Sequence, residues 1–463
     1  MRPVLLIDFG STYTKLTAVD VDAPALLGTA AAYTTIQTDI NDGLAQGLER
    51  LEAVTGKLDY TARYACSSAA GGLRMMACGL VPELTSEAAR MASLGAGAKV
   101  IGLYSYQLTE EDLQEIHDAA PDIFLLVGGT DGGNTTNILH NAKQLATLQP
   151  DFPIIVAGNR TAASACAKAL AGFEVYVCEN VMPKFGVVNI GPTQQKIREI
   201  FLQRIVQAKG LSCAAQTMDG EMMPTPAAVL RALELLSQGC EGEQGIGELV
   251  AVDVGGATTD VYSIADGMPE AMNTVYKGLP EPFAKRTVEG DIGMRYSIHG
   301  IVEEAGVRTV ARLSGLSESR VEELVDYVSR HTDVVGEEGS DLQALDRALA
   351  SLAVRTGVKR HAGTIEETYT MMGKTFVQAG KNLTHIKHIV ATGGSLIHAK
   401  ETEKIAGFAM YSMDDPDSLR PKEARVLVDR SYILAAMGLL SVTEPKAALQ
   451  IMKKELKTYG YPE

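Results

Sequence analysis

A short pattern occurs twice in this chain, and it restricts the possible folds more than any other feature. Residues 4–16 read VLLIDFGSTYTKL, and residues 249–264 read LVAVDVGGATTDVYSI. In each stretch an apolar run ends at an aspartate, Asp8 or Asp253, and continues into a turn rich in glycine and hydroxyl side chains. Apolar runs without alternation are typical of strands that are covered on both faces. The repeat therefore predicts two related halves, each with a buried strand that ends in an acid.

Further apolar runs predict more strands, and helical patterns lie between them. The predicted strands are 4–7, 123–127, 153–157, 175–177, 249–254 and 388–392, and the predicted helices include 137–148, 161–171, 193–210 and 227–237. Strands that alternate with helices indicate an α/β fold with partly parallel sheets. The alternation is clearest at about 120–180.

The length of 463 residues leaves room for two domains with well-buried cores. A polar stretch rich in glycine and acid, residues 237–248, precedes the second aspartate motif. We therefore predict one half at 1–245 and another at 246–463. The second half is expected to contain a largely helical region at about 303–385 and a C-terminal helix at 430–441.

Double glycines follow each aspartate motif at a similar separation. They are Gly128–Gly129 in FLLVGGTDGG and Gly393–Gly394 in IVATGGS. We interpret them as corresponding positions of the two halves.

Composition excludes several classes of function. The net charge is −15 with no sustained stripe of Lys and Arg, which argues against binding nucleic acid through a basic face. The six cysteines show no C-x-x-C spacing, which favours buried reduced thiols over a zinc site. No uncharged apolar run reaches about 18 residues, and Asp8 interrupts the first apolar run. We expect no membrane span, no signal peptide and a cytoplasmic protein.

The two turns have the chemistry of a phosphate site. Glycine lets backbone N–H groups approach an anion, and Ser or Thr hydroxyls add short donors. Carboxylates beside phosphate repel it unless a divalent cation lies between them, and Mg²⁺ prefers few carboxylates and several waters. The acids that fit this role are Asp8, Asp253 and Asp260, while Lys15 could neutralise a phosphate directly. Opposed turns of this kind could hold a polyphosphate from both sides.

Simpler interpretations of the two motifs fit the sequence less well. A single Asp-Gly after a strand is most often only a turn, but two with matching flanks are harder to account for in that way. The DFG string at residues 8–10 does not indicate a protein kinase, because no glycine-rich loop or HRD motif precedes it. The chain also lacks a G-x-x-x-x-G-K-[ST] loop, which argues against a P-loop nucleotidase.

The motifs resemble those of the actin, Hsp70 and sugar-kinase superfamily. VLLIDFGSTYTK is similar to its first phosphate loop, VDVGGATTD to its second, and IVATGGS to its adenosine loop. Ala257 departs from the pattern, since Hsp70 has a third glycine there. The resemblance implies an α/β fold of duplicated actin/Hsp70-like (ribonuclease H-like) ATPase domains that face each other across a nucleotide cleft.

The resemblance also implies roles for individual residues, with ATP and Mg²⁺ as cofactors. It implies that Asp8, Asp253 and Asp260 are catalytic and that Asp8 and Asp253 bind the metal. The residues implied to bind the nucleotide are Gly10, Ser11, Thr12, Lys15, Gly255, Gly256, Ala257, Thr258, Gly393, Gly394 and Ser395.

A narrower resemblance is to the MutL, or GlmL, family. It rests on YACSSAAGGLRMMACGLVPELT (64–85), FLLVGGTDGGNTTNIL (124–139) and VEGDIGMRYS (288–297). Proteins of that family are encoded beside adenosylcobalamin-dependent mutases and aminomutases, such as glutamate mutase or ornithine aminomutase. The resemblance implies an ATP-dependent, chaperone-like factor that reactivates such an enzyme. The chain has no D-x-H-x-x-G pattern, which fits a partner of the cobalamin enzyme rather than the enzyme itself.

Alternatives stay open at this point. A small-molecule kinase of the sugar or acetate kinase type would use the same nucleotide residues, and Asp291 could be its base or could form an N-cap or ion pair. A filament-forming actin relative is a third possibility. The Gly128–Gly133 loop is either a structural relic or a contact for a partner, and Asp131 within it could bind a ligand.

Overall fold

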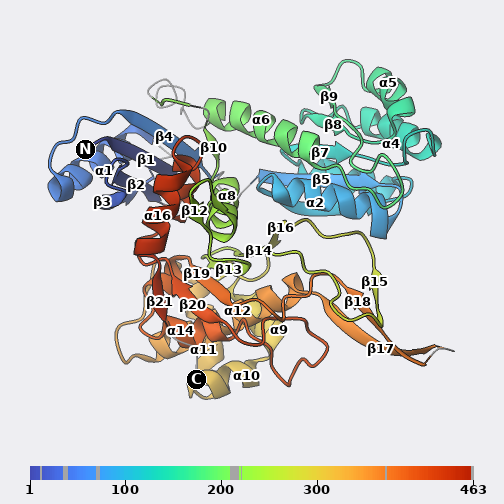
Figure 1. The fold of residues 1–463 in the computed structure, drawn as a ribbon. Helices are drawn as coiled ribbons and strands as arrows, with labels where there is room; N and C mark the ends of the chain where they lie inside the picture. The colour runs from blue at the N-terminus through green and yellow to red at the C-terminus, as the bar shows by residue number, and fades with distance from the viewer. Residues whose placement is uncertain are drawn as a thin grey trace. The chain divides into compact units, whose positions relative to one another are not determined.

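The computed structural model describes residues 1–10, 13–34, 40–68, 73–208, 218–220, 222–370 and 373–459. The chain forms two compact units (Figure 1). Unit 1 comprises residues 1–20, 27–228 and 278–282, and unit 2 comprises residues 21–26, 229–277 and 283–463. Because the units interleave along the chain, the halves 1–245 and 246–463 remain a prediction.

Unit 1 contains a five-stranded sheet in the order β10-β4-β1-β2-β3. Strand β1 pairs antiparallel with β2 and parallel with β4, and β4 pairs parallel with β10. The bounds are β1 Pro3–Phe9, β2 Tyr13–Asp20, β3 Ala25–Tyr33, β4 Ala62–Ser67 and β10 Met223–Pro224. Helix α1 (Ile40–Thr55) lies between β3 and β4 in sequence and packs against β2.

Unit 2 contains a six-stranded sheet in the order β16-β14-β13-β19-β20-β21. Strand β13 pairs antiparallel with β14 and parallel with β19, and β19 pairs parallel with β20. The bounds are β13 Leu249–Val254, β14 Thr259–Ile264, β16 Ala284–Glu289, β19 His388–Thr392, β20 Arg425–Val428 and β21 Lys457–Tyr459. Helix α12 (Asp341–His361) lies between β16 and β19 in sequence and packs against β13 and β14.

The two sheets share one topology. If the strands of each sheet are numbered along the chain, both read 3-2-1-4-5, and β21 is an added edge in unit 2. In both, a helix follows the third strand and packs on the hairpin formed by the first two. This confirms the predicted α/β fold class with two related, actin-like domains.

Unit 1 also carries a second five-stranded sheet, in the order β6-β5-β7-β8-β9, and every pairing in it is parallel. Figure 1 shows β5, β7, β8 and β9 beside α2, α4 and α5. The strands are β5 Leu73–Gly79, β6 Ala98–Ser105, β7 Ile123–Leu126, β8 Ile154–Val156 and β9 Val175–Val177. The helices are η1 Pro82–Ser86, α2 Glu87–Gly95, α3 Glu110–Ala119, α4 Thr136–Thr147, α5 Arg160–Ala169 and α6 Gly191–Ala208. The strands predicted at 123–127, 153–157 and 175–177 are confirmed here.

The interpretation of the double glycines is wrong in one respect. Gly128–Gly129 follow β7, which belongs to the all-parallel sheet, whereas Gly393–Gly394 follow β19 of the aspartate sheet. The topological counterpart of β19 in unit 1 is β4, which leads to residues 69–72, outside the described residues. Their similar separation from the aspartate motifs was therefore not a sign of correspondence.

The region predicted to be largely helical, about 303–385, is helical only as far as His361. The helices here are α9 Ile298–Ala305, α10 Val307–Ser314, α11 Glu318–Arg330 and α12. The chain then forms β17 (Thr364–Thr370) and β18 (Gly373–Ala379), which join β15 (Thr274–Lys277) in a small sheet. The segment TIEETYT is rich in β-branched and aromatic residues, so strand propensity prevails over the helical pattern before it.

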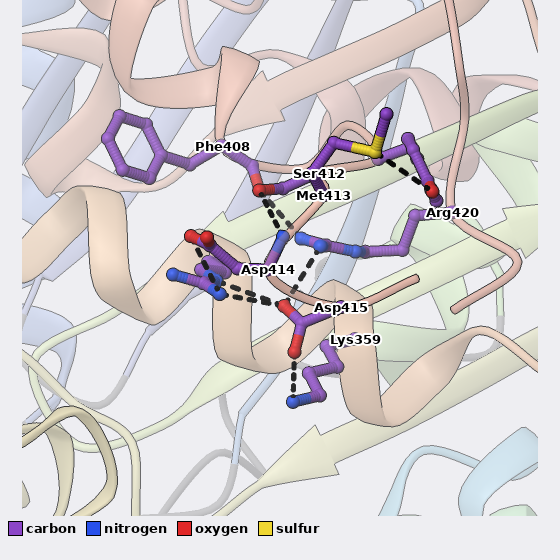
Figure 2. Close-up of polar contacts among 9 residues, drawn as sticks. Lys359, Phe408, Ser412, Met413, Asp414, Asp415 and Arg420 are labelled. Atoms are coloured by element: carbon purple, nitrogen blue, oxygen red, sulfur yellow. Dashed lines mark hydrogen bonds and ion pairs between the residues drawn. The ribbon is translucent and has the colours of Figure 1, made fainter. Parts of the chain in front are cut away.

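A loop at residues 408–421 is clamped to the last turns of α12 (Figure 2). The Asp415 carboxylate accepts hydrogen bonds from Lys359 Nζ at 2.5 Å, Arg355 Nη2 at 2.8 Å and Arg420 Nη2 at 3.1 Å. The Arg420 side chain is fully buried. Burial alone would raise the pKa of Asp415, but the hydrogen bonds from Lys359 and Arg355 outweigh it and lower that pKa.

The remaining elements complete unit 2 and the link to it. Helix α8 (Thr225–Gln238) begins in unit 1 and continues into unit 2. The others are β11 Gly239–Cys240, β12 Glu243–Gln244, α13 Gly394–Ile397, α14 Thr402–Gly407, α15 Leu434–Leu440 and α16 Pro445–Glu455. Among the described residues, the chain has no helix with the length and apolar character needed to span a membrane.

Candidate phosphate-binding site

The first aspartate hairpin lies in unit 1. Asp8 is near the end of β1 and stands opposite Lys15 of β2 in the ladder. The Gly10 N–H donates to the Tyr13 carbonyl at 3.1 Å and closes the turn. A Cβ at Gly10 would lie 2.4 Å from that carbonyl oxygen, so the turn requires glycine. The predicted contacts Ser11 and Thr12 lie outside the described residues.

The Asp8 carboxylate is nearly buried and is held by neutral donors. Its Oδ1 accepts from Thr225 Oγ1 at 2.6 Å and from Cys66 Sγ at 3.4 Å. Lys15 Nζ lies 3.9 Å from Oδ2. Burial, reinforced by the Asp8 charge, raises the pKa of the Cys66 thiol, which therefore keeps the proton that it donates. One oxygen is thus fixed by hydrogen bonds, and the other faces a cation.

The second aspartate hairpin lies in unit 2 and has the same backbone arrangement. The Gly255 N–H donates to the Thr258 carbonyl at 2.9 Å, and Asp253 stands opposite Asp260 in the ladder. The position taken by Lys15 in unit 1 is therefore taken by an acid. The predicted strand at 249–254 is confirmed, and its aspartate is half-buried.

A buried arginine neutralises the additional acid of this hairpin. Arg286 of β16 contacts Asp260 Oδ1 through Nε at 2.8 Å and Nη2 at 2.5 Å. Thr258 Oγ1 donates to Asp260 Oδ2 at 3.3 Å. Burial lowers the pKa of Arg286, but the Asp260 charge more than compensates and leaves that pKa raised, so the guanidinium keeps its charge.

Residues 294–297, which follow β16, donate hydrogen bonds to the carbonyls of the second turn. The N–H groups of Met294 and Arg295 donate to the carbonyls of Gly255 and Gly256 at 3.0 and 2.8 Å. Ser297 Oγ donates to the Ala257 carbonyl at 2.8 Å. The turn's carbonyls are thereby occupied, as a phosphate-binding loop needs, because an anion is bound by N–H groups and repelled by carbonyl oxygens. The Ala257 side chain itself is exposed.

The structure brings Gly393 against the second hairpin. Its φ is +93°, and a Cβ there would lie 2.4 Å from Asp253 Oδ1 and 2.6 Å from the Val254 nitrogen. Only glycine fits this position. A Cβ at Gly394 would meet no atom within 4 Å, and Ser395 is half-buried in α13.

Two further candidate residues have structural partners. Both carboxylate oxygens of Asp291 lie 2.9 Å from Arg360 Nη1, so the ion pair, one of its possible roles, is present. Asp131 accepts from the Arg160 N–H at 2.9 Å and from Asn180 Nδ2 at 3.0 Å. These hydrogen bonds lower the pKa of Asp131 against the opposing effect of its burial.

Sequence reasoning missed Thr225 and Arg286, and it singled out residues 288–297 as a motif without predicting their hydrogen bonds to the second turn. Thr225 is distant in sequence from Asp8, and no local pattern links them. Arg286 has a sequence signal only in retrospect: it is one of two charged residues in the strand-like run KRTV, and such residues must be paired if they are buried.

The donor set fits a hard cation such as Mg²⁺ that shares its coordination with phosphate. The side chains concerned are carboxylates, which suit Mg²⁺, but they are few. Across the described ranges, no group of three or more His, Cys, Asp or Glu side chains is arranged to hold a metal ion alone. Phosphate oxygens and water would therefore supply most of the ligands.

Comparison with known proteins identifies close relatives by sequence. The model of a family described as MutL protein matches residues 4–456. "Protein MutL" of Clostridium tetanomorphum is 46% identical over 460 residues, covering 98% of this chain and 99% of that protein.

Comparison with solved structures finds similarity at low sequence identity. Ligand-bound xylulose kinase from Lactobacillus acidophilus has a TM-score of 0.36 and 10% identity, with coverage of 100% of this chain and 94% of that chain. The activator of 2-hydroxyisocaproyl-CoA dehydratase from Clostridium difficile, with bound ADPNP, has a TM-score of 0.32 and 10% identity, with 99% of each chain covered.

Proposed function

Because the chain belongs to the MutL protein family, we propose that it is an ATP-binding and ATP-hydrolysing factor that reactivates an adenosylcobalamin-dependent mutase or aminomutase in the cytoplasm. Glutamate mutase and ornithine aminomutase represent the class of partner. The family membership and the motif resemblance support the partner. The observation that supports the ATP chemistry is the pair of equivalent hairpins, each with an aspartate at the end of its first strand and a glycine-closed turn.

Each predicted site residue keeps its role in this proposal. Asp8 and Asp253 would bind Mg²⁺, with Asp260 as the third catalytic acid. The amides and hydroxyls of the two turns would bind phosphate, Lys15 would contact the terminal phosphate, and Gly393, Gly394 and Ser395 would bind the adenosine. The turn residues concerned are Gly10, Ser11, Thr12, Gly255, Gly256, Ala257 and Thr258.

The surroundings of the acids support distinct tasks. When bound, Mg²⁺ would neutralise phosphate charge and position the phosphoryl group. Asp260, fixed by Arg286, is oriented but partly neutralised, which suits holding a water by hydrogen bond better than abstracting its proton. Nucleotide exchange would change the affinity for the mutase by favouring one conformation over another.

The partner role is tested with an inactivated holoenzyme. Glutamate mutase that carries damaged cobalamin is incubated with the protein, ATP, Mg²⁺ and fresh adenosylcobalamin, and mutase activity is followed. Recovery that requires hydrolysable ATP is expected, and Asp253→Asn should abolish it while the protein stays folded. Recovery equal to that without the protein would reject the proposal.

The kinase alternative has less support in the structure. Its candidate base, Asp291, is bound through both oxygens to Arg360, which also contacts Glu289 and Glu304. A carboxylate engaged through both oxygens with an arginine is poorly placed to accept the proton of a substrate hydroxyl. ADP formation that is stoichiometric with one phosphorylated metabolite would favour the kinase instead.

A further inference from the structure

The Thr225 hydroxyl forms a short hydrogen bond with the acid of the first aspartate hairpin. Thr225 follows β10, the fifth strand of its sheet, and begins α8. Its Oγ1 lies 2.6 Å from Asp8 Oδ1, and the Cys66 thiol lies 3.4 Å from the same oxygen. A hydrogen bond to a carboxylate is stronger than one between neutral groups. Asp8 Oδ1 is thus held by two donors of its own unit.

In unit 2 the residue that follows the fifth strand makes different hydrogen bonds. Asp429 follows β20, the fifth strand there, and accepts from the N–H of Ile433 at 2.9 Å and from Thr392 Oγ1 at 3.2 Å. Thr392 is the ladder partner of Asp253, as Cys66 is of Asp8. In unit 2 the residue after the fifth strand therefore binds the next turn, whereas in unit 1 it binds the acid of the hairpin.

Fixing one oxygen of Asp8 has a consequence for the other. Lys15 Nζ lies only 3.9 Å from Oδ2, and a small rotation of the carboxylate would bring the two into close contact. A close ion pair would compete with any cation for that oxygen. The Thr225 hydrogen bond opposes this rotation, because the rotation would separate Oδ1 from its donor.

We propose that Thr225 is a positioning residue that holds the Asp8 carboxylate so that Oδ2 is available to the nucleotide-bound divalent cation. This inference rests on the proposed ATP and Mg²⁺ site. It assigns a function to a residue distant in sequence from both phosphate motifs, and it gives Thr225 a role through Asp8 rather than through contact with the nucleotide.

The test measures how much Mg²⁺ strengthens ATP binding. Calorimetric titrations of the full chain with ATP, with and without Mg²⁺, give two dissociation constants whose ratio is the magnesium coupling. Thr225→Val keeps the side-chain shape and removes the donor. We expect its coupling to fall by about tenfold, as for a lost hydrogen bond to a charged group, while Mg²⁺-free affinity changes by less than about twofold. Thr225→Ser should restore most of the coupling.

A matched control separates positioning from stability. Thr193 is a fully buried threonine of unit 1, whereas Thr225 is half-buried, and Thr193 Oγ1 has no hydrogen-bond partner among the described residues. Thr193→Val makes the same chemical change and should leave the coupling at the wild-type value. Melting temperatures of all variants show whether each remains folded at the titration temperature.

The outcomes distinguish the two proposals. Thr225→Val with wild-type coupling, or Thr225→Ser no better than Thr225→Val, would overturn the positioning role and leave the ATP site intact. If the wild-type protein binds ATP with the same affinity with and without Mg²⁺, the proposed function is overturned, and the positioning role with it. The positioning role is supported if Thr225→Val reduces the magnesium coupling at unchanged Mg²⁺-free affinity, while Thr225→Ser and Thr193→Val do not.

Discussion

The two aspartate hairpins have the same backbone and opposite electrostatic arrangements. In unit 1 the acid Asp8 stands opposite the base Lys15, whereas in unit 2 the acid Asp253 stands opposite a second acid, Asp260. Unit 1 holds its acid with neutral donors and a partly exposed lysine. Unit 2 instead places the buried Arg286 against its second acid.

This difference shows that one topology supports two ways of keeping a carboxylate at a strand end. Neutral donors leave the charge of Asp8 almost intact, so it can attract a cation. The second hairpin gains an acid that can orient water, but that acid needs a buried counter-charge to be stable. The units should therefore respond differently to the loss of a charge.

The largest effect is expected from Asp260→Ala. Removing the carboxylate breaks the ion pair at 2.5 Å with the Arg286 guanidinium, whose side chain is 5% exposed, and breaking such a buried pair costs about 3–5 kcal/mol. Lys15→Ala is the corresponding change in unit 1, where the cation is 31% exposed and lies 3.9 Å away, and it should cost less than about 1 kcal/mol. Urea unfolding followed by circular dichroism measures both. Equal losses would contradict the comparison.

A smaller loss is expected from Gly393→Ala. The methyl group would collide with Asp253 Oδ1 and the Val254 nitrogen at a φ of +93°. Strain of this kind costs about 1–3 kcal/mol, and it should also displace Asp253 and weaken ATP binding. Gly394→Ala is the control for stability, because a Cβ there meets nothing within 4 Å. If the two variants melt at the same temperature, the close approach of Gly393 to Asp253 is wrong.

The helices that pack on the two hairpins provide a third comparison. Helix α12 of unit 2 is tied to the 408–421 loop by the Asp415 cluster, whereas in α1 of unit 1 Arg50 Nη1 donates to a neutral acceptor, the Ala31 carbonyl, at 2.7 Å. Asp415→Asn should lower the free energy of unfolding by about 2 kcal/mol at pH 7. Glu338→Gln, at an exposed ion pair with Lys400, is the control and should cost less than about 0.5 kcal/mol.

The Asp415 effect should also depend on pH in a defined direction. The pKa of Asp415 is lowered in the folded protein, so its stabilisation is complete above the ordinary aspartate pKa of about 3.9 and is lost as pH falls through the folded-state value. Urea titrations of the wild type and Asp415→Asn from about pH 7 to about pH 2.5 should converge at the acidic end. A constant difference over that range would show that Asp415 contributes packing rather than charge.

Asp253→Asn should change stability least. Its effect on function should be the most specific. The amide has the shape of the carboxylate, so the protein should stay folded. Mg²⁺-dependent ATP affinity should fall by about tenfold or more, since the proposed metal ligand loses its charge. Asp8→Asn should act in the same direction. Unchanged nucleotide affinity and turnover in both variants would remove these residues from the site.

The sequence was sufficient to predict the strands that lead into the candidate site residues. Apolar runs such as 249–254 and 388–392 became β13 and β19 because central strands need continuous burial. The return strands were harder: β2 and β14 mix polar and apolar residues, and they became evident only from the ladder that pairs Asp8 with Lys15 and Asp253 with Asp260.

Contacts between distant segments could not be predicted. Thr225 reaches Asp8 because β10 is the parallel neighbour of β4, a relationship set by the sheet as a whole. The Gly128–Gly129 pair was assigned to the wrong sheet for the same reason, since glycines after a strand do not reveal which sheet the strand joins. Arg286 likewise acquires its meaning only from the register of β16 against β14.

The central claim is that the aspartate hairpins bind ATP with the help of magnesium, and calorimetric titration of the wild-type protein with ATP tests it most directly. We expect measurable binding that Mg²⁺ strengthens by about tenfold or more. Absence of binding, or the same ATP affinity with and without Mg²⁺, would contradict this claim.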